Sequence, residues 1–196
     1  DGTNQGGFDQ FFMKFDSSGT EIWRKQFGTS EDEDAGKIAI DSYNNVYIIG
    51  TTPGNLGGTS TGNYDVYVMK FDSSGTEIWR TQFGTSKYER QYGLAIDSNN
   101  NLYIVGETTG NFVETGGWIF VMKLDSSGTE IWRKQFGSDS IAYDVATDSN
   151  NNVYINGYTR NNLAGTNQGD ADVFLIKYDS NGTEILKKQL GTTGYD

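Results

Sequence analysis

The 196-residue sequence contains no cysteine and no histidine. Without cysteine there can be no disulfide and no thiolate chemistry. Without histidine the chain lacks the commonest general base and the commonest metal ligand. Basic residues are also scarce, with 15 Lys and Arg against 26 Asp and Glu. The net charge of −11 argues against nucleic acid as a partner, because phosphate binding depends on clustered basic side chains.

Long hydrophobic runs and proline are scarce as well. The apolar runs have the length of strands, well below the roughly 18 residues of a membrane span, so no membrane insertion is expected. Pro53 is the single proline, whereas the 26 glycines make glycine about twice as frequent as usual. This balance is typical of a chain with many tight hairpins.

The chain does contain a tandem repeat. The segment DSSGTEIWRKQFG begins at Asp16 and returns, with few changes, at offsets of 56, 53 and 54 residues. The four copies cover residues 16–28, 72–84, 125–137 and 179–191, and a second block between them covers 38–50, 94–106 and 145–157. A fixed period of this size indicates a solenoid or propeller, in which one unit cannot bury its apolar face alone.

Each repeat contains four strand-length segments separated by turn residues. In the best-defined copy these are residues 92–98, 101–108, 118–125 and 129–137, bounded by Asp, Ser, Asn and Gly. Four short antiparallel strands make one propeller blade. The sequence therefore predicts an all-β fold, a β-propeller of four-stranded antiparallel blades, with about 3.5 blades in this chain as a partial ring or a protomer of a larger assembly.

The blade boundaries follow from the same pattern. We expect one propeller segment over residues 1–196, with a half blade at 1–34 and complete blades at 35–84, 85–137 and 138–196.

The repeat resembles a known family, the bacterial seven-bladed β-propeller repeat abbreviated SBBP. The first part of the family pattern is matched by Asp65, Tyr67, Lys70, Asp72, Gly75, Trp79 and Gly84, and the second by Leu94, Ala95, Asp97, Asn101, Tyr103, Gly106 and Thr108. The chain departs from the pattern at Trp118, in place of Asp, and at Leu186, in place of the repeated Trp. The resemblance implies a propeller and a bacterial source, but no common activity.

The half blade predicts association. Its first strand would leave an unpaired apolar edge at Phe11, Phe12, Met13 and Phe15, and such edges pair with other chains. We therefore expect self-association or completion by missing sequence. The acidic, cysteine-free composition is typical of a secreted or cell-surface protein, with an intracellular location as the alternative.

Recurring charged residues have a structural interpretation. Lys14, Lys70, Lys123 and Lys177 recur in all four copies, as do Asp16, Asp72, Asp125 and Asp179. We expect a structural ion pair and a hairpin turn from them. Calcium is the alternative, with Asp32 and Asp34 as weak candidate ligands, although the EF-hand spacing is not met. No other cofactor is expected.

No catalytic residue is assigned. Serines have no histidine partner, and the recurrent carboxylates occupy turn positions. We therefore expect no enzyme, and a glycosidase acting through paired carboxylates is the alternative of a different class.

Binding residues are sought among aromatic side chains and among positions that break the repeat. Trp23, Trp79 and Trp132 occur once per blade and could stack on sugars, as in a propeller lectin, or pack between blades. The repeat-breaking candidates are Trp118, Phe112, Glu114, Tyr158 and Arg160, in or beside loops, where binding usually resides. The expected function is an extracellular scaffold or binding module for protein or glycan partners. A self-assembling surface or filament component and a lectin are the alternatives.

Overall fold

The computed structural model describes residues 2–114 and 116–194, and over these residues the chain is all-β. The first sheet has two strands, β1 (Gln10–Phe15) and β2 (Glu21–Phe27). The second has four, β3 (Asp34–Ile40), β4 (Val46–Thr52), β5 (Asp65–Phe71) and β6 (Glu77–Phe83). The third comprises β7 (Glu89–Ile96), β8 (Leu102–Thr108), β9 (Ile119–Leu124) and β10 (Glu130–Phe136), and the fourth β11 (Ser140–Thr147), β12 (Val153–Thr159), β13 (Asp172–Tyr178) and β14 (Glu184–Leu190).

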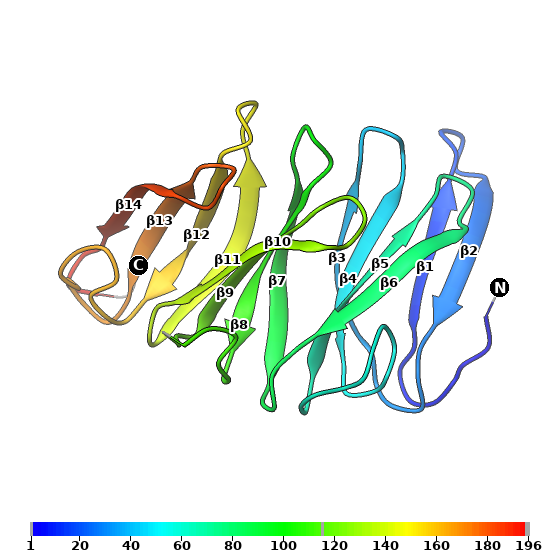
Figure 1. Cartoon of the computed structure of the whole chain (residues 1–196), viewed down its shortest axis with the longest axis horizontal. Coiled ribbons are helices and arrows are strands. Elements are labelled where there is room, and N and C mark those ends of the chain that lie inside the picture. Colours follow the sequence, from blue (N-terminus) through cyan, green and yellow to red (C-terminus); the bar gives the residue numbers. More distant parts are fainter. Residues whose placement is uncertain (1, 115, 195–196) are drawn as a thin grey trace. The chain divides into compact units, whose positions relative to one another are not determined.

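Strands that follow one another in the chain are neighbours in every sheet, and all paired strands are antiparallel. Figure 1 shows this order most clearly for β11 to β14. Three four-stranded blades and one two-stranded half blade confirm the predicted fold class. None of the described residues forms a helix long and apolar enough to cross a membrane.

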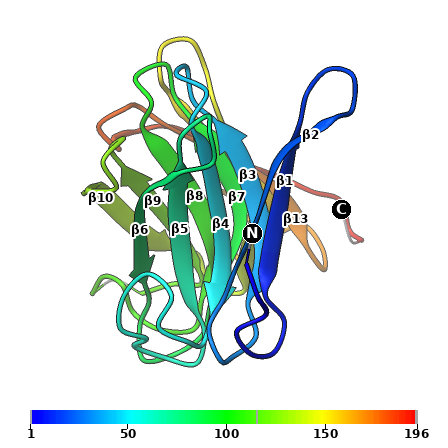
Figure 2. The same cartoon turned by 90° about the vertical axis from the view of Figure 1, so that its right-hand side faces the viewer.

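Contacts between residues divide the chain into two compact units, Asp1–Tyr88 and Glu89–Asp196. The first unit holds the half blade and the β3–β6 blade, and the second holds the β7–β10 and β11–β14 blades. Figure 2 faces the β1–β2 hairpin of the first unit, which forms a ribbon of its own.

The DSSG segment forms the hairpin turn between the last two strands of a blade. The carboxylate of Asp72 accepts hydrogen bonds from the backbone N–H groups of Ser74 at 2.8 Å and Thr76 at 2.9 Å. The hydrogen bond from the Ser74 hydroxyl, together with these backbone bonds, holds the pKa of Asp72 below its usual range. Gly75 has a φ of 83°, which favours glycine.

The same turn also joins neighbouring blades within a unit. Trp23 donates its indole N–H to the Ser73 carbonyl at 3.2 Å, and Lys14 donates to the same oxygen at 2.8 Å. In the second unit Trp132 and Lys123 donate to the Ser180 carbonyl at the same distances. These contacts give the repeated tryptophan and lysine a structural role between neighbouring blades in both units.

The recurring lysine pairs with a different aspartate from the one expected. Lys123 Nζ lies 3.9 Å from the carboxylate of Asp97, which belongs to the turn between the first two strands of the blade, whereas Asp125 forms the DSSG turn. Asp97 also accepts a hydrogen bond from the Tyr103 hydroxyl at 3.1 Å. Burial lowers the pKa of Lys123, and the nearby carboxylates oppose this effect. The ion pair expected from the sequence therefore exists, but it connects the third strand of the blade to the turn between the first two strands.

Candidate functional site

The half blade is the least complete part of the fold. The third strand of a complete blade pairs on both sides, as β5 does with β4 and β6. Its equivalent β1 pairs only with β2 within the described part of the chain. Its other edge therefore presents backbone N–H and C=O groups that a further strand could use.

The side chains on one face of β1 are exposed where the complete blades bury theirs. Phe11 is 72% exposed, Met13 37% and Phe15 51%. The matching side chains of the complete blades are at most 4% exposed: Tyr67, Met69, Phe71, Phe120, Met122, Leu124, Phe174, Ile176 and Tyr178. We call Phe11, Met13 and Phe15 the open face of the half blade.

The fourth predicted edge residue, Phe12, points the other way, because successive strand side chains alternate between faces. It is 7% exposed, with its ring centroid 5.2 Å from that of Trp23 and 4.8 Å from that of Phe71. The structure thus places three of the four edge residues together on the open face and places Phe12 in the core of the first unit.

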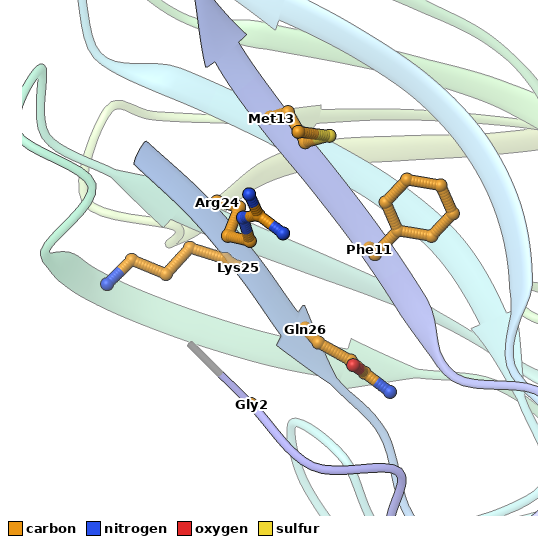
Figure 3. Close-up of a pocket in the computed structure, with 6 residues that line it drawn as sticks. All are labelled: Gly2, Phe11, Met13, Arg24, Lys25 and Gln26. Carbon is orange, nitrogen blue, oxygen red and sulfur yellow. The ribbon is translucent and has the colours of Figure 1, made fainter. Parts of the chain in front are cut away.

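A pocket of about 430 Å³ lies on the open face (Figure 3). Phe11 and Met13 of β1 face Gln26 and Arg24, their partners on β2, and Gly2 and Lys25 complete the lining. The guanidinium of Arg24 is fixed by two hydrogen bonds to the carboxylate of Glu21, at 2.7 and 2.6 Å. The pocket therefore combines the phenyl ring of Phe11 and the thioether of Met13 with a cationic and amide rim, which suits contact with a polypeptide.

Beside it the strand β3 is exposed along most of its length. Ile38 is 58% exposed and Ile40 62%. With Phe12 and Met13 they line a second, smaller hollow of about 170 Å³. In the second unit the equivalent strand β11 packs against β7 and β8 of the preceding blade. In the first unit, the exposed side of β3 corresponds to the side of β11 that β7 and β8 cover.

A second open face lies on the blade β11–β14. Leu175 is 38% exposed and Leu190 68%. They stand at the repeat positions of Phe12 and Phe27, which pack inside the first unit. Leu186 replaces tryptophan on the same strand as Leu190 and so lacks the indole N–H. We call Leu175, Leu186 and Leu190 the leucine face.

The repeat-breaking residues of the long loop in the third repeat lie in different environments. Trp118 is 48% exposed and is anchored by its backbone, which donates to Gly137 and accepts from Thr108. Phe112 is packed edge-on against Phe120, with the Arg133 guanidinium 5.4 Å from its ring centroid. The side chain of Glu114 is exposed in the loop.

Tyr158 and Arg160 do lie together. The Arg160 guanidinium is 5.1 Å from the Tyr158 ring centroid and 3.4 Å from the Asp139 carboxylate. Tyr158 and Asp139 raise the pKa of Arg160 above its ordinary value. Two further tyrosines and a second arginine join this pair, and no motif in the sequence indicated them.

The three repeated tryptophans lie in packed positions. The Trp23 and Trp132 rings lie over Gly75 and Gly182 of the next blade, where a Cβ would come within 3.0 and 3.2 Å of the indoles. Trp79 packs edge-on against Tyr47 at 5.9 Å.

Asp32 and Asp34, the two candidate metal ligands, do not form a ligand set with a third acidic side chain among the described residues. The Asp32 carboxylate accepts a hydrogen bond from the Phe8 backbone at 2.8 Å, and Asp34 is exposed at the start of β3. Over residues 2–114 and 116–194 no group of three or more acidic side chains is placed to hold a metal ion. The buried carboxylate in this run is Glu33, which accepts hydrogen bonds from the hydroxyls of Thr29 and Thr52 at 2.7 Å.

Successive four-stranded antiparallel sheets with a repeated turn and a repeated tryptophan define a β-propeller repeat protein. The chain belongs to the SBBP β-propeller repeat family, whose pattern it matches over residues 22–58, 78–112 and 131–164.

Two curated proteins are similar to the chain in sequence. An uncharacterized WD repeat-containing protein, L264, of Acanthamoeba polyphaga mimivirus is 27% identical over 197 residues, which cover 76% of this chain and 14% of that protein. The regulatory protein FlaEY of Caulobacter vibrioides is 23% identical over 173 residues, covering 78% of this chain and 18% of that protein. The chain thus spans less than a fifth of either relative.

Solved structures show the same fold at low identity. A gluconolactonase from Xanthomonas campestris is 13% identical with a TM-score of 0.51, covering 93% of this chain and 56% of its own. An apocarotenoid oxygenase from Synechocystis is 10% identical with a TM-score of 0.51, covering 90% and 44%. These similarities support the fold alone.

Proposed function

We propose that the chain is a non-enzymatic scaffold that binds another blade of its own repeat type, carried by a second copy of the chain. The observation that carries this proposal is the open face of the half blade, where Phe11, Met13 and Phe15 are exposed although the matching residues of every complete blade are buried. Such a contiguous exposed apolar face is typical of an interaction site.

A contact between two blades inside the first unit shows how the two copies could pack together. Inside the first unit, Phe12 and Phe27 pack against Phe71 and Tyr67, with ring centroids 4.8 and 6.0 Å apart. The leucine face carries leucine at the positions of Phe12 and Phe27, and the open face carries phenylalanine at the positions of Tyr67 and Phe71. Docking the leucine face of one copy onto the open face of another would therefore repeat a contact that the chain already makes.

This contact joins two different surfaces and is heterologous. Such contacts generate closed rings or open filaments, depending on whether the rotation between copies closes. The arrangement suits a structural component outside the cell, and we propose a secreted or cell-surface location on the basis of the acidic, cysteine-free composition.

The recurring charged groups support a role without catalysis. Asp97 is engaged with Tyr103 and Lys123, and Asp72 holds a hairpin turn. Their repetition in other blades matches a structural need of each blade, whereas a catalytic centre requires a group that is free to react.

Light scattering of the purified 196-residue chain at micromolar concentration tests the proposal. We expect an average mass above that of one chain, increasing with concentration. A concentration-independent monomer would contradict self-association through these faces.

A further inference from the structure

A cluster of three tyrosines and two arginines lies on the second unit, on the strands β7, β11 and β12 and at Arg160, directly after β12. The ring centroids of Tyr92 and Tyr143 are 6.3 Å apart, and those of Tyr143 and Tyr158 are 5.7 Å apart. The Arg90 guanidinium lies 5.6 Å from the Tyr92 ring and that of Arg160 lies 5.1 Å from the Tyr158 ring. Two blades thus contribute to one row of rings with an arginine at each end.

Two of the three tyrosines are placed by β-bulges. The pairing of β7 with β8 shifts between Gln91 and Gly93, and that of β11 with β12 shifts between Ala142 and Asp144. Tyr92 and Tyr143 are the residues at these shifts. A bulge adds an unpaired residue and re-aims its side chain, and bulges are enriched beside functional sites.

The repeat offers a comparison for these positions. The pairing of β3 with β4 also shifts register, between Ala35 and Ile38, but the residues at this shift are Gly36 and Lys37. A register shift at this place therefore occurs in all three complete blades, whereas tyrosine occupies it in two of them, at Tyr92 and Tyr143. Tyr143 is 51% exposed although it is a large aromatic residue with ring neighbours on both sides.

Three carboxylates lie around the rings beside the two arginines. Asp139 lies 3.4 Å from Arg160, Asp144 is exposed next to Tyr143, and Glu107 is the cross-strand partner of Arg90. The surface therefore has no excess positive charge to attract an anionic partner. It offers rigid aromatic faces, planar arginine donors and carboxylate acceptors.

This combination matches a sugar. One face of a pyranose ring carries C–H groups that lie flat on an aromatic ring, and its edge carries adjacent hydroxyls that both donate and accept hydrogen bonds. We propose that the tyrosine row binds a neutral saccharide, with a pyranose ring on Tyr143 and its hydroxyls contacting Arg90, Arg160 and the neighbouring carboxylates. The open face belongs to the first unit, but the leucine face belongs to the second unit with the tyrosine row, and Val173 pairs with Tyr158 on one side and with Leu190 on the other. Saccharide binding is therefore measured at a concentration at which the chain is monomeric, so that it is distinguished from self-association.

Isothermal titration calorimetry with defined glycans tests the site. The neutral probes are maltohexaose, cellohexaose, yeast mannan and a galactan, and the anionic probes are polygalacturonate and a poly-glutamate peptide. We expect at least one neutral probe to bind, and Tyr143→Ala to weaken that binding at least tenfold. Tyr143→Phe, which keeps the ring, should retain most of it, and Arg160→Lys should weaken it because lysine lacks the planar fork.

The matched control is Tyr43→Ala, which removes a tyrosine that is 74% exposed in the first unit and should leave binding unchanged. Circular dichroism melts of all variants establish that they fold. The proposal is overturned if no neutral probe binds, if only the anionic probes bind, or if Tyr143→Ala and Tyr43→Ala have the same effect.

Discussion

The indole N–H of Trp132 donates a hydrogen bond to the backbone carbonyl of Ser180 at 3.2 Å, and so joins the two blades of the second unit. The tryptophan of one repeat is thereby hydrogen-bonded to the DSSG-type turn of the next repeat. Trp23 donates to Ser73 in the same way in the first unit, so the two motifs contact each other in both units.

Removing this contact should destabilise the second unit in two steps. Trp132→Phe keeps a ring but loses the hydrogen bond, which should cost about 1 kcal/mol. Trp132→Ala also loses the packing against Tyr178 and Tyr103, and should cost about 2–4 kcal/mol. Chemical denaturation followed by fluorescence measures both. Ile131→Ala, at a side chain that is 50% exposed, is the control and should stay within about 0.5 kcal/mol of the parent.

Substitutions at two turn glycines distinguish the cost of a left-handed backbone from the cost of a clash with the neighbouring blade. Gly19 and Gly182 have φ values of 82° and 83°, but a Cβ at Gly19 would meet nothing within 4 Å among the described residues, whereas one at Gly182 would lie 3.2 Å from Trp132. Gly19→Ala should cost about 1 kcal/mol for the left-handed backbone alone. Gly182→Ala should cost more, about 2–3 kcal/mol. Equal losses in denaturation would show that the tryptophan contact does not constrain this turn.

Acid should destabilise the protein through its turn aspartates. The Asn152 side chain, assisted by backbone N–H groups, holds the pKa of Asp148 well below its ordinary value. A depressed folded-state pKa contributes stability above the unfolded value, about 4, and this contribution is lost as the pH falls below it. Asp148→Asn should therefore lower the melting temperature at pH 7 and reduce its dependence on pH between about 5 and 2. Asp170→Asn, at an exposed loop carboxylate, is the control, and an identical pH profile in both variants would contradict the assignment.

Self-association should depend on both open faces. Phe11→Lys on the open face and Leu190→Lys on the leucine face should each weaken it at least tenfold, because a buried unpaired charge is costly. Ile131→Lys places the same charge at a position that is half exposed in the folded chain and should have no effect.

Mixing the two lysine variants gives the sharper result. Each keeps one intact face, so a head-to-tail contact predicts that the mixture forms dimers but nothing larger. Light scattering that shows no dimers in the mixture, or full-sized assemblies of either variant alone, would argue against this contact.

Part of the fold was predictable from local patterns. The DSSG and DSNNN turns, the strand lengths and the four-strand blade depend on residues within a few positions of one another, and the structure confirms them as sheets of consecutive antiparallel strands. The recurrence of Trp132 and its equivalents was also visible, but its partner, Ser180, was not. That partner is 48 residues away and contributes only a backbone carbonyl, which has no signature in the sequence.

The candidate sites were predictable only in part. The apolar strand of the half blade drew attention to Phe11, Met13 and Phe15, yet the opposite orientation of Phe12 required the actual pairing of β1 with β2. Tyr158 and Arg160 break the repeat, and the sequence predicts them as binding residues for that reason. Tyr92 and Tyr143 could not be predicted, because they occur in repeated strands and no local pattern indicates a bulge.

The sequence by itself therefore determined the blade, since periodic turns and strands of fixed length are local and repeat four times. Only the tertiary structure decided which faces the blades bury, which faces stay open, and which side chains meet across blades. The physical reason is that hydrogen-bonded turns form between neighbours in the chain. The contact between Tyr143 and Tyr92, in contrast, arises from packing between strands of different blades.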